Sequence, residues 1–162
     1  MWEIASLLMV ARNDIPRIML ESYPHPFIFA HRGASAQAPE NTLAAFQLAL
    51  AQQADGIELD VKLSADGHVV VIHDPTVERT TGAKGRVKDM SLAQLRSLDA
   101  GSFFAQSFQS ETIPTLEEVF ETMGKRLFIN VELTNYNSPR DQLVETVCML
   151  VKKFNLQKHV MF

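Results

Sequence analysis

Two carboxylates stand two positions apart in an otherwise apolar segment. In "GIELDV" (residues 56–61), Glu58 and Asp60 alternate with Ile57, Leu59 and Val61. Side chains of a strand point alternately to opposite faces, so a strand would place both acids on one face and the apolar residues on the other. The pattern indicates either a strand with a solvated acidic face or a cation site, because buried carboxylates repel each other without a positive charge between them.

Further polar side chains occur where other strands are expected to end. "FIFAHRG" carries His31 and Arg32, "VVVIHD" carries His73, and "FINVEL" carries Glu132. The downstream ends of parallel strands form the ligand-binding face of α/β folds. We therefore expect these side chains to gather around the acidic pair, which favours the cation site.

The turn signal Asp66-Gly67 follows this strand and predicts a hairpin. A two-residue turn would place Asp60 directly opposite His73, and such pairs have Cβ atoms about 5 Å apart on one face. The turn thus predicts a carboxylate beside an imidazole.

The residue types favour phosphate chemistry. Three carboxylates with no cysteine nearby are oxygen ligands suited to Ca²⁺, Mg²⁺ or Mn²⁺ rather than to structural zinc. Arg32 offers a planar fork for an anion, and His31 and His73 can exchange protons near neutral pH. A Lewis acid, an anion clamp and an acid–base pair are what cleavage of a phosphate ester requires.

Alternating strand and helix signals predict an α/β domain with a largely parallel sheet. Helix starts are indicated by Asn41 as N-cap, by capping boxes at Ser91 and Thr115, and by Ser138 before a proline. The expected strands are a short buried strand within 26–33, the acidic strand at 56–61, then 68–74, 126–133 and the start of a further one at 159–162; the expected helices begin near 41, 91, 115 and 138.

Composition sets limits on the class of protein. The 162 residues suffice for one globular domain, and the formal net charge of −4 with unclustered basic residues gives no reason to expect a nucleic-acid partner. The lone Cys148 lies among apolar residues, which indicates core packing and fits a reducing, cytoplasmic compartment. Residues 1–25 are expected to form a helical extension docked on the domain, with peripheral membrane contact as the alternative.

An ordered series of motifs resembles the glycerophosphodiester phosphodiesterase family. "HRG", "PENT", "GIELDV", "DGHVVVIHD", "RTT", "IPTLEEV" and the strand carrying Glu132 follow the family pattern over residues 27–162. The resemblance implies a phospholipase-C-like TIM barrel and metal-dependent hydrolysis of small glycerophosphodiesters to glycerol 3-phosphate and an alcohol. It also implies roles for the residues above: His31 and His73 as the acid–base pair, Arg32 on the substrate phosphate, and Glu58, Asp60 and Glu132 as ligands of Ca²⁺, Mg²⁺ or Mn²⁺.

The same resemblance gives supporting positions and one departure. Glu40 and Asn41 match "PENT", where we expect Asn41 to cap the helix and Glu40 to hold the loop near His31. Residues 75–114 match a small insertion that walls the substrate cleft. Thr134 stands where family members often carry a lysine that contacts phosphate, and its hydroxyl brings no charge.

A TIM barrel takes about 250 residues, so this sequence is expected to supply only the first four to five strands, in a domain spanning 26–162. A fragment or truncated product is the expectation, with self-association over the open sheet as an alternative. Two other functions stay open, namely a sphingomyelinase-D-like phospholipase and a non-catalytic half-barrel that binds a cation or phosphate.

Overall fold

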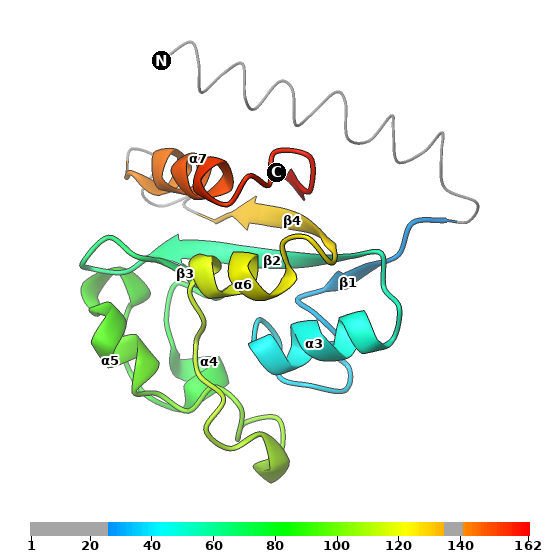
Figure 1. Ribbon diagram of the computed structural model, residues 1–162. Coiled ribbons are helices and arrows are strands. Elements are labelled where there is room, and N and C mark those ends of the chain that lie inside the picture. Colours follow the sequence, from blue (N-terminus) through cyan, green and yellow to red (C-terminus); the bar gives the residue numbers. More distant parts are fainter. Residues whose placement is uncertain (1–25, 135–140) are drawn as a thin grey trace.

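The computed structural model describes residues 26–134 and 141–162, so the predicted helical extension and the predicted cap at Ser138 lie outside the described residues. Strands and helices alternate along most of the chain (Figure 1). The strands are β1 (Phe29–His31), β2 (Gly56–Leu63), β3 (Val69–Val71), β4 (Phe128–Leu133) and β5 (Val160–Met161). The α-helices are α3 (Leu43–Ala51), α4 (Glu78–Thr81), α5 (Leu92–Arg96), α6 (Leu116–Met123) and α7 (Leu143–Lys153), with short 3-10 turns η1 (Val87–Asp89) and η2 (Gln106–Phe108).

The sheet is mainly parallel, as the alternation of elements predicted. Its order is β1-β2-β4-β5 with all of these pairs parallel, and β3 alone runs antiparallel to β2. β1 pairs with residues 56–58 of β2 and β3 with residues 61–63, while β4 runs along residues 56–61. A strand has two edges, and β4 occupies one edge of β2. β1 and β3 therefore share the other edge, with β1 along the first residues of β2 and β3 along the last.

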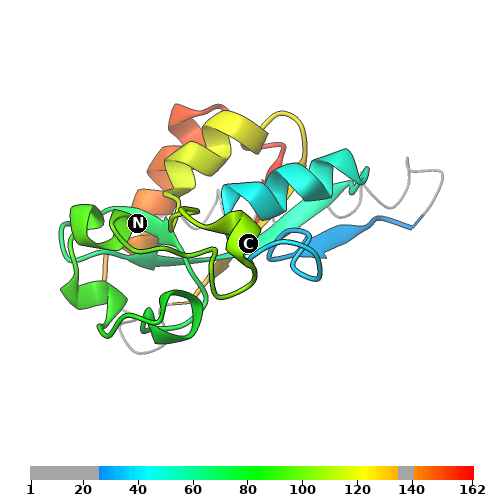
Figure 2. The ribbon, with the colours of Figure 1, turned by 90° about the horizontal axis from the view of Figure 1, so that it is seen from below.

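The two faces of β2 have different neighbours. Ile57, Leu59 and Val61 are fully buried in the main core, which α3, α6 and α7 complete from one side of the sheet (Figure 2). Full burial of such a side chain stabilises the fold by about 1.5–3 kcal/mol. The alternation along the strand then turns Glu58 and Asp60 to the opposite face.

Two expectations about local structure need correction. The N-cap of α3 is Thr42, whose hydroxyl accepts a hydrogen bond from Ala45 N, and not Asn41. Asn41 instead takes a left-handed backbone conformation with φ 56°. The strand within residues 26–33 is only partly buried, because β1 lies at an edge of the sheet and pairs with β2 alone among the described strands.

The predicted two-residue hairpin turn is wrong by one residue. The backbone N–H of Ser64 donates to His68 O (2.9 Å), so three residues form the loop, and the last of them, Gly67, has φ +83°. Three-residue hairpin loops take this form, with a left-handed residue at the end. The Ser64 hydroxyl accepts from His68 N at 2.9 Å and stabilises the longer loop.

This loop changes the register of the hairpin. Ile72 N donates to Asp60 O at 2.9 Å, and Val61 pairs with Val71. Asp60 therefore lies opposite Ile72, and His73 is not its cross-strand partner. The approach of His73 to the site depends on the segment after β3 and not on the ladder.

Residues 75–114 pack around a second, smaller core beside the carboxyl end of β2 (Figure 1). Both predicted capping boxes are confirmed: Ser91 with Gln94 begins α5, and Thr115 with Glu118 begins α6. The buried apolar residues of this second core are Val70, Ile72, Val77, Val87, Leu95, Ala100 and Ile113. Within residues 26–134 and 141–162, no helix is both long and apolar enough to cross a bilayer.

Candidate active site at the carboxyl end of the sheet

The parallel register brings the predicted acids together. His31 pairs with Glu58 across β1 and β2, and Asp60 pairs with Glu132 across β2 and β4. Carboxylate oxygens of Glu58, Asp60 and Glu132 lie within 4.8 Å of one another. Strand pairing between segments more than 70 residues apart thus builds the acidic cluster, which is defined here as these three side chains.

Two members of the cluster, Glu58 and Asp60, are buried, whereas Glu132 is exposed. Glu58 is 9% exposed and Asp60 is 1% exposed, and one oxygen of each, Oε1 and Oδ1, is buried without a hydrogen-bond partner in the described part of the chain. Burial raises the pKa of Glu58, and the charge of Asp60 raises it further. A buried oxygen without a hydrogen bond lowers the stability of the fold, because it has lost its contact with water. An oxygen-only set of this kind therefore fits a hard divalent cation.

Arg32 ties the loop after β1 to the cluster. Its backbone N–H donates to both Glu58 O and Glu58 Oε2, each at 3.0 Å. Its guanidinium donates to Glu40 Oε1 at 3.0 Å, and its Nε lies 3.4 Å from Asp60 Oδ2. The positive charge of Arg32 thus compensates two acids, one of which, Glu40, links the loop after β1 to the segment before α3.

The conformation of this loop depends on the "HRG" segment. Arg32 has φ 58° and Gly33 has φ +80°. A Cβ at Gly33 would lie 2.7 Å from Ala45 Cβ, which is too close for any other residue. Glycine therefore allows the loop to pack on α3 while Arg32 turns back toward β2.

Asn41 contacts the cluster directly. Its Nδ2 donates to Asp60 Oδ2 at 3.0 Å, and its Oδ1 is buried without a hydrogen-bond partner among the described residues. The left-handed backbone at this position, which asparagine tolerates better than most residues, aims the amide at β2. The sequence assigned Asn41 a supporting role, but as a helix cap and not as a partner of Asp60.

A second charged group lies next to Glu40. Arg79 of α4 donates to both oxygens of Glu40 at 2.8 Å, and its Nε donates to Asp74 Oδ2 at 2.7 Å. Asp74 Oδ1 in turn lies 2.6 Å from His73 Nδ1. The hydrogen bonds from Arg79 lower the pKa of Asp74 to about 2. The ionised Asp74 therefore orients the His73 ring through its Nδ1.

Sequence reasoning assigned no role to Arg79 or Asp74. The available signal was the position of Asp74 directly after His73 and of Arg79 at the start of "RTT". The contact of Arg79 with Glu40 joins residues 39 positions apart, which no local pattern indicates.

The two histidines lie at the surface of the site. The His31 side chain is 70% exposed, with Nε2 3.7 Å from Glu58 Oε2, and the His73 side chain is 41% exposed. Both imidazoles are accessible to a molecule arriving from solvent.

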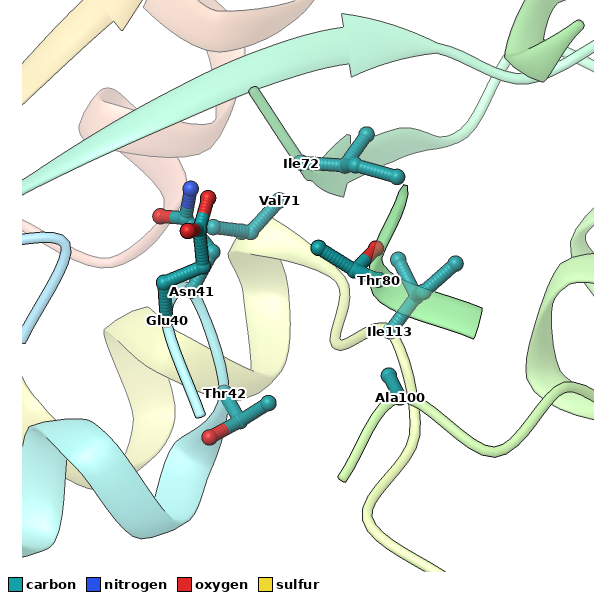
Figure 3. Close-up of a pocket in the computed structure, with 8 residues that line it drawn as sticks. All are labelled: Glu40, Asn41, Thr42, Val71, Ile72, Thr80, Ala100 and Ile113. Carbon is teal, nitrogen blue, oxygen red and sulfur yellow. The ribbon is translucent and has the colours of Figure 1, made fainter. Parts of the chain in front are cut away.

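A small cavity separates the Glu40–Asn41 loop from the insertion (Figure 3). Its volume is about 10 Å³, roughly the space of one water molecule, so it cannot hold a phosphodiester. The lining residues are Glu40, Asn41, Thr42, Val71, Ile72, Thr80, Ala100 and Ile113.

Thr134 and Lys62 lie beyond the cluster at the ends of β4 and β2. Lys62 Nζ donates to Thr134 O at 2.9 Å and to Thr134 Oγ1 at 2.6 Å, and the hydroxyl donates to Val61 O at 2.9 Å. Burial lowers the pKa of Lys62. Lys62 was missed by the sequence analysis, although its position two residues after Asp60 puts it on the same face of β2.

Comparison with known proteins identifies the family. Residues 31–161 match the model of the glycerophosphoryl diester phosphodiesterase family. The chain belongs to this family. The match includes every residue of the acidic cluster and both histidines.

Relatives within the family are similar over most of this chain. A glycerophosphodiester phosphodiesterase of Caldanaerobacter subterraneus subsp. tengcongensis is 47% identical over 134 residues, which cover 82% of this chain and 55% of the relative. One from Bacillus altitudinis is 43% identical and covers 83% of this chain and 56% of the relative. The chain therefore spans about half the length of the curated relatives it matches.

Solved structures of the family show the same fold. A glycerophosphodiester phosphodiesterase from Agrobacterium tumefaciens superposes with a TM-score of 0.77 at 40% identity, covering 84% of this chain and 56% of the other. A phosphodiesterase from Oleispira antarctica, in complex with the product sn-glycerol-3-phosphate, gives a TM-score of 0.76 at 41% identity, covering 80% and 53%. The predicted fold class is confirmed: the described sheet and helices correspond to about half of a TIM barrel.

Proposed function

We propose that this chain carries the cation-binding and acid–base residues of an enzyme that hydrolyses glycerophosphodiesters to glycerol 3-phosphate and an alcohol. The observation that carries the proposal is a pair of buried oxygens, one of Glu58 and one of Asp60, that have no hydrogen-bond partner among the described residues. They lie beside Glu132 at a strand end flanked by two accessible histidines. Family membership supports the reaction class, and the product bound to the Oleispira relative supports the substrate class.

Glu58, Asp60 and Glu132 would hold the divalent cation, for which Ca²⁺, Mg²⁺ and Mn²⁺ all suit the oxygen ligands. When bound, such a cation supplies Lewis acidity and positive charge at a phosphate oxygen. Arg32 keeps the Glu58 carboxylate in place through its backbone N–H and adds positive charge next to the phosphate. This assignment gives Arg32 a positioning role in addition to the predicted contact with substrate.

The two histidines would move the protons. Hydrolysis needs one group to accept a proton from the attacking oxygen and another to donate one to the leaving alkoxide. Asp74 holds the Nδ1 side of His73, so His73 would act through Nε2. His31 would act from the end of β1, where it borders Glu58 of β2.

The test is release of glycerol 3-phosphate from glycerophosphocholine by this chain with each divalent cation in turn. We expect His31→Ala and His73→Ala to abolish release while circular dichroism shows an unchanged fold. His68→Ala is the matched control, because it removes an exposed imidazole directly after the hairpin loop, and it should retain full activity. Unchanged turnover in either site variant would refute the assignment. Calorimetric cation binding without any product would instead support a non-catalytic binding module.

We extend the proposal to a reducing, cytoplasmic location, supported by the single cysteine, Cys148, which is buried and unpaired with any other. Self-association remains a prediction that the solution mass of the chain tests directly.

A further inference from the structure

Positive side chains at the carboxyl end of the sheet differ in what neutralises them. Arg32 contacts Glu40 and Asp60, and Arg79 contacts Glu40 and Asp74. Each guanidinium therefore has two carboxylates as partners. Their charge is largely used within the protein, so they have less of it to offer to an incoming anion.

Lys62 has a different environment. Its ammonium donates to the carbonyl and the hydroxyl oxygen of Thr134, both of which are neutral, and it forms no ion pair with any residue the structure describes. An ammonium carries three N–H donors, and only two of those of Lys62 have partners in the described chain. The charges of Asp60, Asp74 and Glu132 also act on the ammonium, whose hydrogen bonds within the described chain go to Thr134 alone. The third N–H donor of this half-buried charge gains from an anionic oxygen, because charge-assisted hydrogen bonds are the stronger ones.

The position of Lys62 follows from the strand register. Glu58, Asp60 and Lys62 alternate along one face of β2, and Asp60 pairs with Glu132 of β4. Thr134 comes two residues after Glu132, so the Lys62–Thr134 pair lies one side-chain step beyond the Asp60–Glu132 pair. That step is about 6.6–6.8 Å toward the carboxyl end. The ammonium thus lies next to the acidic cluster, on its carboxyl-terminal side.

We propose that Lys62 contacts the substrate phosphate and that Thr134 positions its ammonium for this contact. The proposal rests on the function proposed above, since it assumes that a phosphodiester binds over the acidic cluster. Thr134 is suited to the positioning role because its own hydroxyl is fixed by donation to Val61 O. Lys62 of β2 would then add its positive charge to that of Arg32, while Thr134 after β4 contributes the oxygens that orient the ammonium.

A purely structural role for Lys62, as a tie between the ends of β2 and β4, makes a different prediction. Lys62→Gln can still donate to Thr134 but carries no charge. A structural tie would survive this change or lose only stability. A phosphate contact would lose affinity for the anion while the fold and the cation affinity stay the same.

The experiment measures calorimetric binding of inorganic phosphate and of sn-glycerol 3-phosphate to this chain with saturating Mg²⁺. We expect Lys62→Gln to bind both anions at least about tenfold more weakly, which is the loss of one charge-assisted hydrogen bond. Lys62→Gln/Thr134→Lys, which moves the charge to the neighbouring strand, should recover most of the affinity. Lys153→Gln is the matched control, because it removes a lysine charge from exposed α7, and should bind like the unsubstituted chain.

The outcomes separate this inference from the proposed function. Equal binding of both anions by Lys62→Gln and the unsubstituted chain would overturn the role of Lys62, as would absence of anion binding by the unsubstituted chain. Failure of the unsubstituted chain to release product would refute the proposed hydrolysis alone. Weakened phosphate binding in Lys62→Gln supports the contact whether or not turnover is seen.

Discussion

Replacing Glu58 by glutamine should change stability in opposite directions without and with a divalent cation. Glu58 and Asp60 are both buried, and their carboxylate oxygens lie within 4.8 Å of each other. At an effective dielectric constant of about 20, two unit charges at this distance repel each other by roughly 3.5 kcal/mol. Glutamine has almost the same shape and still accepts the hydrogen bond from Arg32 N, but it removes the repulsion.

Part of that repulsion is already relieved in the native chain. The guanidinium of Arg32 lies beside Asp60 and offsets part of its charge. We therefore expect Glu58→Gln to raise the free energy of unfolding by about 1–3 kcal/mol in the presence of a chelator. For a chain of this length, each kcal/mol raises Tm by about 2–4 °C.

A bound cation should favour the unsubstituted chain over Glu58→Gln in stability. At a cation concentration of about 100 times Kd, binding stabilises the unsubstituted chain by roughly 2.7 kcal/mol. Loss of one carboxylate ligand that weakens affinity about tenfold would halve this gain at the same concentration. Glu58→Gln should thus show the higher Tm in EDTA and a clearly smaller increase when Mg²⁺, Ca²⁺ or Mn²⁺ is added.

The assay is thermal unfolding followed by circular dichroism in EDTA and in a titration of each cation. Glu121→Gln is the matched control, since it removes the same charge from the exposed face of α6 and should leave both values unchanged. A Glu58→Gln variant that is less stable in EDTA, with the full cation-dependent increase retained, would show that Glu58 is neither repelled by its neighbours nor a ligand.

Two further predictions concern the elements that support the site. Arg79→Met should lower the free energy of unfolding by about 1 kcal/mol at pH 7, because half-exposed ion pairs contribute no more than this. Since the folded pKa of Asp74 is depressed from 3.8 to about 2, its stabilisation is present above pH 4 and is lost as the pH falls toward 2. In urea unfolding, the difference in the free energy of unfolding between the unsubstituted chain and Arg79→Met should accordingly shrink over that pH range. A constant difference would contradict the assignment. Thr115→Ala removes the cap of α6 and should cost about 1 kcal/mol in urea unfolding at pH 7; an unchanged midpoint would show that Glu118 alone holds the helix start.

Local patterns predicted those parts of the molecule that local interactions build. The capping boxes at Ser91 and Thr115 are confirmed because their hydrogen bonds join residues three positions apart. The placement of Glu58 and Asp60 on one face is confirmed because strand alternation is a property of the backbone. The hairpin register failed where one extra loop residue, stabilised by Ser64, shifted the ladder.

What the sequence by itself determined is the fold class, the family and the identity of the acids and histidines at the strand ends, since these depend on periodicity and on ordered motifs. Only the tertiary structure decided that Asp60 is fully buried against Asn41, that Arg79 joins Glu40 to Asp74, and that the Lys62 ammonium donates its hydrogen bonds to Thr134. These contacts join segments far apart in the chain. Their geometry depends on how the strands pair and how the loops pack, and no spacing within one segment contains that information.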